Sequence, residues 1–289
     1  MKLLIFTDND LDGAGSALFV KWLFRDKLTK FDVIDTTEAT FINDFNNKAS
    51  TFIDYDRIFI LDLDLNQEQA ALANQKQIVV VDHHTPHINH KYIYNNAKGI
   101  IQQHESCIGL LYEKFGESVS LTDAQRELIK YVNDYDSYNL NHKDSLKLNA
   151  IHRTYNNPKA EKFIEAFDTG FRPFTIQEKN SIKLFIKKFK EQLQGQVFIG
   201  KIKNYKTVSI IANYAISEVA GFLIDKYNAD IGIVVNLDTK TVSFRRSKQS
   251  NVDLSILARS LCDGGGSPGV AGGNLTQEFG SLTKYFTPC

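Results

Sequence analysis

Three short apolar runs in the first third of the chain each lead into acidic residues, and this repeat constrains the fold more than any other feature. The runs cover residues 3–6, 58–61 and 77–81, and the acids that follow them begin at Asp8, Asp62 and Asp82. Runs rich in β-branched and other apolar residues predict strands that are buried on both faces of a parallel sheet. Ligands of open α/β sheets bind beyond the carboxyl ends of such strands, so these acids lie where a site is expected.

The order of the patterns predicts an α/β protein of two domains. Strand and helix patterns alternate up to about residue 150, which predicts a parallel sheet with helices on both faces, and residues 15–24 give the first helix. A long amphipathic helix follows from about residue 175, and further strands and helices predict a smaller second α/β domain. We therefore expect domains at 1–174 and 196–289, joined by a linking helix at 175–195.

The residue types at the strand ends predict a metal site. The acids come in the strings Asp8-Asn-Asp10-Leu-Asp12 and Asp62-Leu-Asp64, and in Asp82-His83-His84. A single Asp after a strand is more often a turn former or a helix cap than a ligand. Several carboxylates at one sheet edge, however, repel one another unless a cation offsets their charge. Oxygen-rich ligands with one or two imidazoles favour manganese or magnesium over zinc.

Two later motifs carry further candidate residues. The string Asp134-Tyr-Asp136-Ser-Tyr138 stands at the end of a predicted helix. The glycine-rich segment 264–273 follows a predicted strand, which ends in Arg245 and Arg246, and then an apparent helix. Backbone amides of glycine can approach a phosphate closely, and an Arg at a strand end can bind it with two hydrogen bonds.

Taken together, these motifs resemble the DHH phosphoesterases over nearly the whole chain. Their order is most similar to the two-domain branch with a glycine-rich, DHH-associated C-terminal domain, which includes the RecJ exonucleases and the nanoRNases, and within it to the NrnB-like nanoRNases. The resemblance implies two manganese ions, with magnesium as the alternative, and Asp62 as the bridging ligand. It implies as further metal ligands Asp8, Asp10, Asp12, His83 and Asp136, or Asp134 in place of Asp136, because both acids can be aligned with the last acid of the family.

The resemblance also implies residues that act on the substrate. His84 would hold the substrate phosphate or the leaving oxygen, and Asp82 would fix the orientation of an imidazole. The implied substrate-binding residues are Arg245, Gly264, Gly265, Gly266 and Ser267. The family carries histidines at the positions of Asp8 and Ser267, so the metal preference and the substrate affinity of this chain are expected to differ from those of the family. His104 to Cys107 matches a family loop near the substrate, and a helix cap at Ser106 is the alternative interpretation.

The expected function is hydrolysis of short single-stranded RNA or DNA to mononucleotides by a metal-dependent phosphodiesterase. Two alternatives remain: an enzyme acting on a small nucleotide such as 3′-phosphoadenosine 5′-phosphate or a cyclic dinucleotide, and a catalytically silent nucleotide-binding protein. The balance of 34 basic and 34 acidic residues argues against tight binding of long duplex DNA. Three cysteines without metal spacing, and no apolar run long enough to span a bilayer, predict a cytoplasmic protein without membrane contact. A homodimer is left open.

Overall fold

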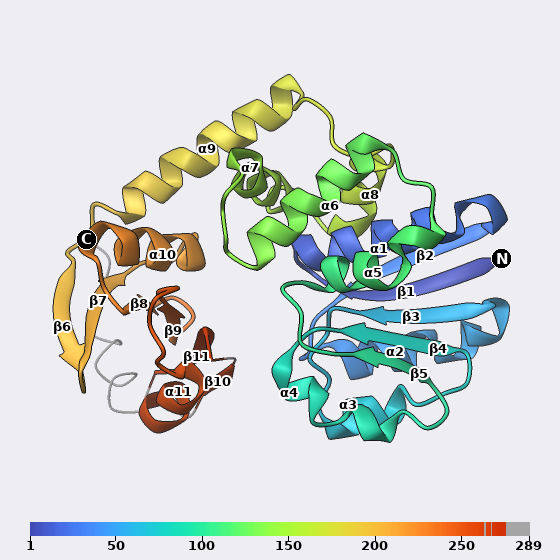
Figure 1. Ribbon diagram of the computed structural model, residues 1–289, viewed down its shortest axis with the longest axis horizontal. Helices are drawn as coiled ribbons and strands as arrows, with labels where there is room; N and C mark the ends of the chain where they lie inside the picture. Colours follow the sequence, from blue (N-terminus) through green and yellow to red (C-terminus); the bar gives the residue numbers. More distant parts are fainter. Residues whose placement is uncertain (263, 267, 276–289) are drawn as a thin grey trace. The chain divides into compact units, whose positions relative to one another are not determined.

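The computed structural model describes residues 1–262, 264–266 and 268–275. The chain forms two compact units, Met1–Ile182 and Lys183–Cys289 (Figure 1). The division falls inside helix α9 (Ile176–Gln192). The domain limits expected at residues 174 and 195 therefore stay a prediction, and each unit is described by itself.

The N-terminal unit is a doubly covered parallel sheet. Its elements, in chain order, are β1 (Lys2–Asp8), α1 (Leu11–Phe24), β2 (Lys30–Thr36), α2 (Phe41–Lys48), β3 (Arg57–Leu61), α3 (Gln67–Leu72), β4 (Ile78–Asp82), α4 (Thr85–Ile88), β5 (Lys98–Ile101), α5 (Cys107–Phe115), α6 (Asp123–Asp136), α7 (Lys143–His152) and α8 (Lys159–Phe167). Short 3-10 segments lie at Arg25–Lys27, Ala49–Asp54, Lys91–Ile93 and Gly116–Ser118.

The strand order of this first sheet brings the predicted acids together. The order is β2-β1-β3-β4-β5, and all of its pairings are parallel. Strands β1, β3 and β4 are therefore neighbours, and their carboxyl ends meet at one edge. This confirms the parallel α/β architecture that the apolar runs predict.

The alternation of side chains along each strand builds one core on each face of the sheet. In β1, Leu3 and Ile5 join a core with helices α1, α5, α6, α7 and α8, whereas Leu4 and Phe6 face α2, α3 and the 3-10 segment Ala49–Asp54. Figure 1 shows the two helical layers on either side of the sheet. Both faces of the sheet are therefore covered by helices, and the candidate residues lie at the ends of its strands.

The C-terminal unit is a second, mostly antiparallel sheet. Its elements are β6 (Phe198–Ile202), β7 (Tyr205–Ile211), α10 (Ile216–Tyr227), β8 (Ile231–Asn236), β9 (Thr241–Arg246), α11 (Leu254–Cys262), β10 (Gly265–Gly266) and β11 (Val270–Asn274). The strand order is β10-β11-β9-β8-β7-β6, and β7 pairs with β8 in parallel. Alternate residues of β8 point to the two faces: Val234 packs in a core with α10, and Ile233 in a core with α11.

Two elements differ from the sequence prediction. Helix α1 begins at Leu11 rather than at Gly15, because Asp10 caps it and accepts a hydrogen bond from the Gly13 amide at 2.9 Å. The segment expected to be a glycine-rich loop is partly strand: Gly265 and Gly266 pair with Gly272 and Ala271, and β11 then pairs with β9. Within the described ranges no helix is both long and apolar enough to cross a membrane.

Candidate metal centre and active site

His83 lies at the centre of a cluster of carboxylates. Its Nε2 atom is 3.2 Å from Asp62 Oδ1, 3.6 Å from Asp136 Oδ2 and 3.8 Å from Asp12 Oδ2. Its Nδ1 atom is 3.1 Å from the backbone carbonyl oxygen of His104. A carbonyl oxygen only accepts, so Nδ1 carries a hydrogen, and in the tautomer that has its only hydrogen there the lone pair of Nε2 faces the three acids. A lone pair that faces carboxylates suits a cation between them.

Asp62 holds its carboxylate in this cluster by means of an unusual backbone conformation. It follows β3 directly, has φ 59°, and its amide donates to the Val81 carbonyl at 3.0 Å. Its side chain is 3% exposed, and among the described residues Oδ1 has no hydrogen-bond partner. Burial, together with the charges of Asp12 and Asp10, raises the pKa of Asp62 well above its usual range. A buried carboxylate oxygen without a donor is costly, and a bound divalent ion would satisfy it.

Asp12 connects the cluster to the start of helix α5. It lies in the first turn of α1, is 1% exposed, and accepts the backbone amides of Cys107 at 2.6 Å and Ile108 at 3.0 Å. Burial raises the pKa of Asp12, and the neighbouring His83 acts in the opposite direction. Each oxygen of an ionised carboxylate has two lone pairs, so Asp12 can bind a helix N-terminus and still offer an oxygen to an ion.

Asp8 and Asp10 flank the cluster. Asp8 ends β1 and accepts the Asn9 amide at 2.8 Å, while Asp10 caps α1. Burial and the charge of Asp10 raise the pKa of Asp8 to about 7. In the part of the chain that the structure describes, the groups whose ligand atoms lie within 4.8 Å of one another are Asp62 with His83 and His84, and Asp12 with His83 and Asp136. Neither Asp8 nor Asp10 belongs to these two groups, so their part as ligands remains a prediction.

The two acids at the end of α6 have different surroundings. Asp134 is buried, and its carboxylate accepts the amides of Asn141 and His142 at 3.0 Å and the Ser145 hydroxyl at 2.6 Å. Burial acts against these hydrogen bonds, which nevertheless lower the pKa of Asp134. It thus fixes the loop that leads into α7. Asp136 instead lies beside His83, so the geometry favours Asp136 as the site acid.

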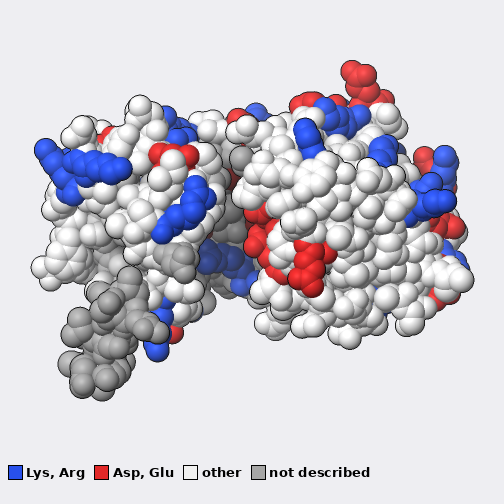
Figure 2. Space-filling view, turned by 90° about the horizontal axis from the view of Figure 1, so that it is seen from below, with Lys and Arg blue, Asp and Glu red and all other residues white. Residues whose placement is uncertain are grey.

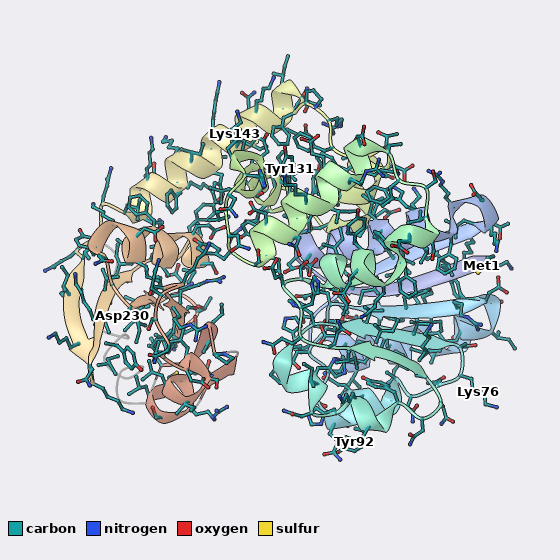
Figure 3. The ribbon with its side chains drawn as sticks, in the orientation of Figure 1. Met1, Lys76, Tyr92, Tyr131, Lys143 and Asp230 are labelled. Atoms are coloured by element: carbon teal, nitrogen blue, oxygen red, sulfur yellow. The ribbon has the colours of Figure 1, made fainter. Side chains whose placement is uncertain are left out.

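The loop between Asp136 and α7 is also held by aromatic contacts of helix α6. The ring of Tyr131 lies 5.5 Å from the His142 ring and 4.8 Å from the Phe171 ring, measured between centroids. Figure 3 shows Tyr131 inside this helical layer and Lys143 at the start of α7. The segment after Asp136 is therefore ordered by contacts on both sides.

Asp82 organises the other half of the site. It ends β4, is fully buried, and its Oδ1 lies 2.8 Å from His84 Nδ1, while its Oδ2 lies 2.9 Å from His87 Nδ1. Burial alone would raise the pKa of Asp82, but the hydrogen bonds with the two histidines hold it well below its usual range. Burial alone would lower the pKa of His84, but the hydrogen bond and charge of Asp82 raise it to about 10. His84 is therefore a cation at neutral pH.

Acidic side chains dominate the surface of this edge. Asp64 is half-buried and Glu38 is exposed, and partial removal from water raises the pKa of both, with His84 acting in the opposite direction. Figure 2 shows acidic side chains gathered on the N-terminal unit at the side where its strands end. Such a surface attracts cations.

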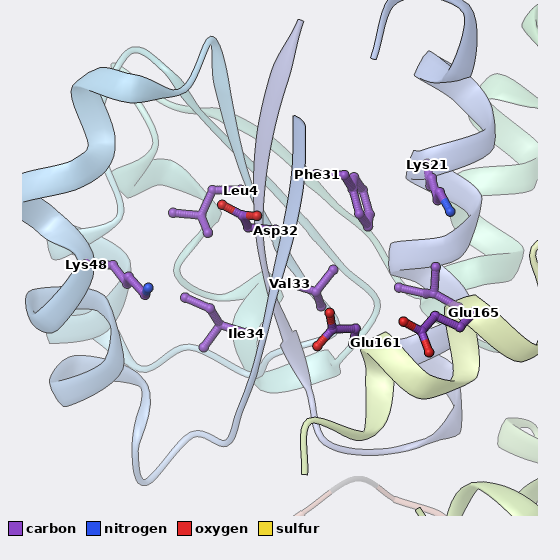
Figure 4. A pocket seen from close by; sticks show the side chains of 10 residues that line it. Leu4, Lys21, Phe31, Asp32, Val33, Ile34, Lys48, Glu161 and Glu165 are labelled. Atoms are coloured by element: carbon purple, nitrogen blue, oxygen red, sulfur yellow. The ribbon is translucent and has the colours of Figure 1, made fainter. Parts of the chain in front are cut away.

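A separate pocket of the N-terminal unit lies away from the strand ends. Its volume is about 500 Å³, and it is lined by Leu4, Lys21, Phe31, Asp32, Val33, Ile34, Lys48, Glu161, Ile164 and Glu165 (Figure 4). None of these is a candidate site residue. Lys21 is paired with Asp168 at 2.8 Å.

In the C-terminal unit, packing explains most of the glycine cluster. A Cβ atom at Gly264 would lie 2.0 Å from the Gly272 carbonyl oxygen, and Gly266 has φ 131°. At Gly265, by contrast, a Cβ atom would meet nothing within 4 Å. Arg245 is half-buried in β9, where it pairs in register with Gly232 and Val270. Ser267 lies outside the described residues.

The family of the catalytic half follows from a sequence comparison. Residues 2–135 match the model of the DHH family, N-terminal domain. The N-terminal part of this chain belongs to the DHH family. The match contains the Asp82-His83-His84 string and stops one residue before Asp136.

Solved structures with the same fold extend the likeness beyond the DHH domain. An exopolyphosphatase-related protein from Bacteroides fragilis is 14% identical with a TM-score of 0.56, and the match covers 98% of this chain and 90% of that chain. The pGpG-specific phosphodiesterase PggH from Vibrio cholerae is 16% identical with a TM-score of 0.60 and covers 98% and 96%. RecJ from Thermus thermophilus, solved with Mn²⁺, is 10% identical with a TM-score of 0.54 and covers 98% and 51%. Among curated proteins none matches the sequence.

The site also contains residues that the sequence patterns did not identify. His87 binds Asp82, and Tyr94 binds His87 at 2.6 Å. The carbonyl of His104, in the loop that the resemblance places near the substrate, orients His83. The three-residue spacing of His84 and His87 in the sequence could have identified His87 as part of the site. Ser106 caps α5 by accepting the Gly109 amide at 3.0 Å, which confirms the helix-cap interpretation, and the neighbouring His104 also lies at the site.

Proposed function

We propose that this DHH protein is a phosphodiesterase that hydrolyses short single-stranded oligonucleotides to mononucleotides with two manganese ions, or with magnesium as the alternative. The observation that carries the proposal is the group of Asp12, Asp62 and Asp136 around one imidazole nitrogen of His83. Such oxygen-rich sets suit manganese and magnesium.

The donor set fits divalent ions on its own chemistry. Asp62 brings a buried oxygen to which no described residue donates a hydrogen bond. It belongs with His83 to one group, while His83 also belongs to the group of Asp12 and Asp136. We assign Asp62 as the ligand shared by two ions, and Asp8 and Asp10 as further ligands. Bound ions would supply the Lewis acidity and the activated water that phosphodiester hydrolysis needs.

His84 is the group that acts on the substrate. Its Nδ1 is engaged by Asp82 at 2.8 Å, which leaves Nε2 to donate a hydrogen bond to a phosphate or leaving oxygen. Because the pKa of His84 is raised to about 10, Nε2 carries a proton at neutral pH. A charged donor stabilises negative charge that develops on oxygen.

The C-terminal unit would bind the rest of the substrate. Gly265 leaves its backbone open on the side where a Cβ atom would stand, so a phosphate or base can approach closely. Arg245 carries a positive charge in β9, the strand that pairs with β11 at the end of the glycine-rich segment. Ser267, in place of a histidine, would offer one neutral hydrogen bond and would bind the substrate more weakly.

A small nucleotide is the second candidate substrate. PggH, which shares the fold, is named for action on pGpG, and a linear dinucleotide is at once a short oligonucleotide and a small nucleotide. The acidic surface of the DHH edge (Figure 2) disfavours long polyanions, because uncompensated carboxylates repel phosphates. We therefore place the preferred length at the short end.

A substrate panel tests the proposal. End-labelled RNA and DNA of two to about twenty nucleotides, 3′-phosphoadenosine 5′-phosphate and cyclic dinucleotides are each incubated with manganese, magnesium or chelator. We expect hydrolysis of the shortest oligonucleotides with manganese and none in chelator, because the carboxylates need an ion to act. Activity that persists in chelator would contradict the metal mechanism. Activity confined to 3′-phosphoadenosine 5′-phosphate or to cyclic dinucleotides would establish the second candidate, and binding without hydrolysis would show a silent nucleotide-binding protein.

A further inference from the structure

A buried chain of hydrogen bonds runs from His84 into the interior of the N-terminal unit. His84 Nδ1 lies 2.8 Å from Asp82 Oδ1, Asp82 Oδ2 lies 2.9 Å from His87 Nδ1, and His87 Nε2 lies 2.6 Å from the Tyr94 hydroxyl. Asp82 and His87 are both 0% exposed. The proposed function assigns roles to His84 and Asp82 but none to His87 and Tyr94.

The chemistry of the groups fixes the direction of these hydrogen bonds. An ionised carboxylate only accepts, so both imidazoles donate from Nδ1 to Asp82. A neutral His87 then has an acceptor at Nε2, and the Tyr94 hydroxyl is the donor that faces it. Each atom in the chain thus has one role, and His84 is left with Nε2 as its outward atom.

Local sequence places the chain. His84 precedes helix α4, Pro86 lies in the first turn of that helix, and His87 follows three residues after His84. Residues three apart at a helix start lie on the same side, so both rings reach the single carboxylate at the end of β4. A Cβ atom at Gly99 would come within 3.1 Å of the Tyr94 ring, so a glycine in β5 makes room for the tyrosine.

A buried carboxylate can rotate about its side-chain torsion unless both oxygens are held. In this chain Asp82 Oδ1 is held by His84, and Oδ2 by His87 and, at 3.3 Å, by the His84 amide. His87 would itself be free to swing if Tyr94 did not engage its far nitrogen. The orientation of His84 therefore depends on groups that never touch the substrate.

We propose that His87 and Tyr94 are positioning residues for the reaction: through Asp82 they hold His84 in the orientation that aims the Nε2 hydrogen at the reacting phosphate. This inference rests on the proposed function in so far as it assigns His84 to the substrate. It differs from a purely structural role in one respect: the effect of His87 on turnover passes through His84.

The variants differ in which hydrogen bond they remove. Tyr94→Phe removes the last hydroxyl, His87→Asn keeps a nitrogen donor near the position of Nδ1, and His87→Leu removes both hydrogen bonds. Tyr92→Phe is the matched control, because Tyr92 is 65% exposed two residues away from Tyr94. We expect kcat to fall about 10- to 100-fold for His87→Leu, less for Tyr94→Phe and His87→Asn, and not for Tyr92→Phe. The manganese concentration for half-maximal activity should stay unchanged.

A double-mutant cycle separates positioning from structure. In a His84→Gln background the substitution His87→Leu should cost no further turnover, because the residue through which it acts is gone. An equal loss in both backgrounds, or no loss in either, would overturn the proposal. Tyr94→Phe gives the same cycle should His87→Leu fail to fold.

Nitrogen-15 chemical shifts of the imidazoles test the chain without any substrate. We expect both His84 and His87 to carry hydrogen on Nδ1 in the parent, and the His84 Nδ1 signal to move in Tyr94→Phe and His87→Leu but not in Tyr92→Phe. Two outcomes would refute the inference: a ring at either position with hydrogen on Nε2 and none on Nδ1, or a His84 Nδ1 chemical shift that is unchanged in both variants. Should no nucleotide be hydrolysed while these shifts behave as expected, the proposed function fails and the positioning chain stands.

Discussion

Asp62 combines three unfavourable features at one residue. Its backbone is left-handed with φ 59°, its carboxylate is 3% exposed, and its Oδ1 atom has no hydrogen-bond partner among the described residues. A non-glycine residue in this conformation costs about 1 kcal/mol or more, and such strain persists where the surroundings impose it. The other strand-end acids show no positive φ. We interpret Asp62 as the residue whose geometry is set by function.

Asp62→Asn should separate metal binding from folding. Asn tolerates the left-handed region better than other residues and removes the buried charge, so we expect the metal-free protein to be as stable as the parent or more stable, by about 1 to 3 kcal/mol. Turnover and the rise of the melting temperature with manganese should be lost. Thermal unfolding with and without manganese measures both. A variant that still gains the full stabilisation from manganese would show that Asp62 is not a ligand.

The pair Asp134 and Asp136 gives a matched comparison of two acids in one turn of helix. Asp134→Asn weakens hydrogen bonds to Asn141, His142 and Ser145, so the free energy of unfolding should fall by about 1 to 3 kcal/mol with metal affinity retained. Asp136→Asn should lower metal affinity, because its carboxylate lies beside His83. Urea unfolding and manganese titration on both variants decide this, and the reverse pattern would make Asp134 the ligand.

At the scale of elements, the glycine cluster consists of two kinds of glycine. Gly264 has no room for a side chain, since a Cβ atom would stand 2.0 Å from the Gly272 oxygen, whereas Gly265 has open space. We expect Gly264→Ala to destabilise the C-terminal unit by about 1 to 3 kcal/mol or more. Gly265→Ala should change stability by less than about 0.5 kcal/mol and yet raise KM severalfold. An unchanged KM for Gly265→Ala in the folded protein would remove the glycine segment from the substrate site.

The positions at which β1, β3 and β4 end could be predicted from the sequence. The runs before Asp8, Asp62 and Asp82 are β-branched and apolar because they are buried on both faces, and the parallel order that brings them together follows from the helix patterns between them. In the C-terminal unit, strand β9 ends at Arg246, where the sequence predicts its end. These are local signals that burial makes strong.

What could not be predicted depends on contacts far apart in sequence. The hydrogen bonds of Asp12 with the Cys107 amide, and of His83 with the His104 carbonyl, join residues whose spacing carries no pattern. Asp134 and Asp136 look alike in sequence, and only the loop after α6 distinguishes them. The glycine segment was expected to be a loop because glycine is poor in strands; it pairs as strand because close backbone approach to β9 excludes side chains.

At the scale of the whole molecule, an equal number of basic and acidic residues conceals an uneven distribution. The strand-end edge of the DHH domain concentrates carboxylates whose pKa values are raised by burial, among them Asp8, Asp12 and Asp62. The folded protein without metal therefore stores electrostatic repulsion. Stability, metal binding and pH should be coupled through this edge.

The metal-free protein should lose stability as pH rises from about 6.5 to 8.5. Asp8 and His84 have folded pKa values above their ordinary ones, raised to about 7 and to about 10, so in this window the folded state binds more protons than the unfolded state. Stability then falls with rising pH, by about 1.4 kcal/mol per pH unit for each extra proton bound. His152, whose pKa burial lowers to about 4, acts in the opposite direction only below about pH 6.5. Saturating manganese should displace the carboxylate protons and reduce the slope, and Asp8→Asn should reduce it without metal in the lower part of the window. Urea unfolding across the pH series, with chelator or with manganese, measures each slope. A metal-free slope that is flat or positive would mean that the clustered acids are not under repulsion, and the metal site would lose its electrostatic basis.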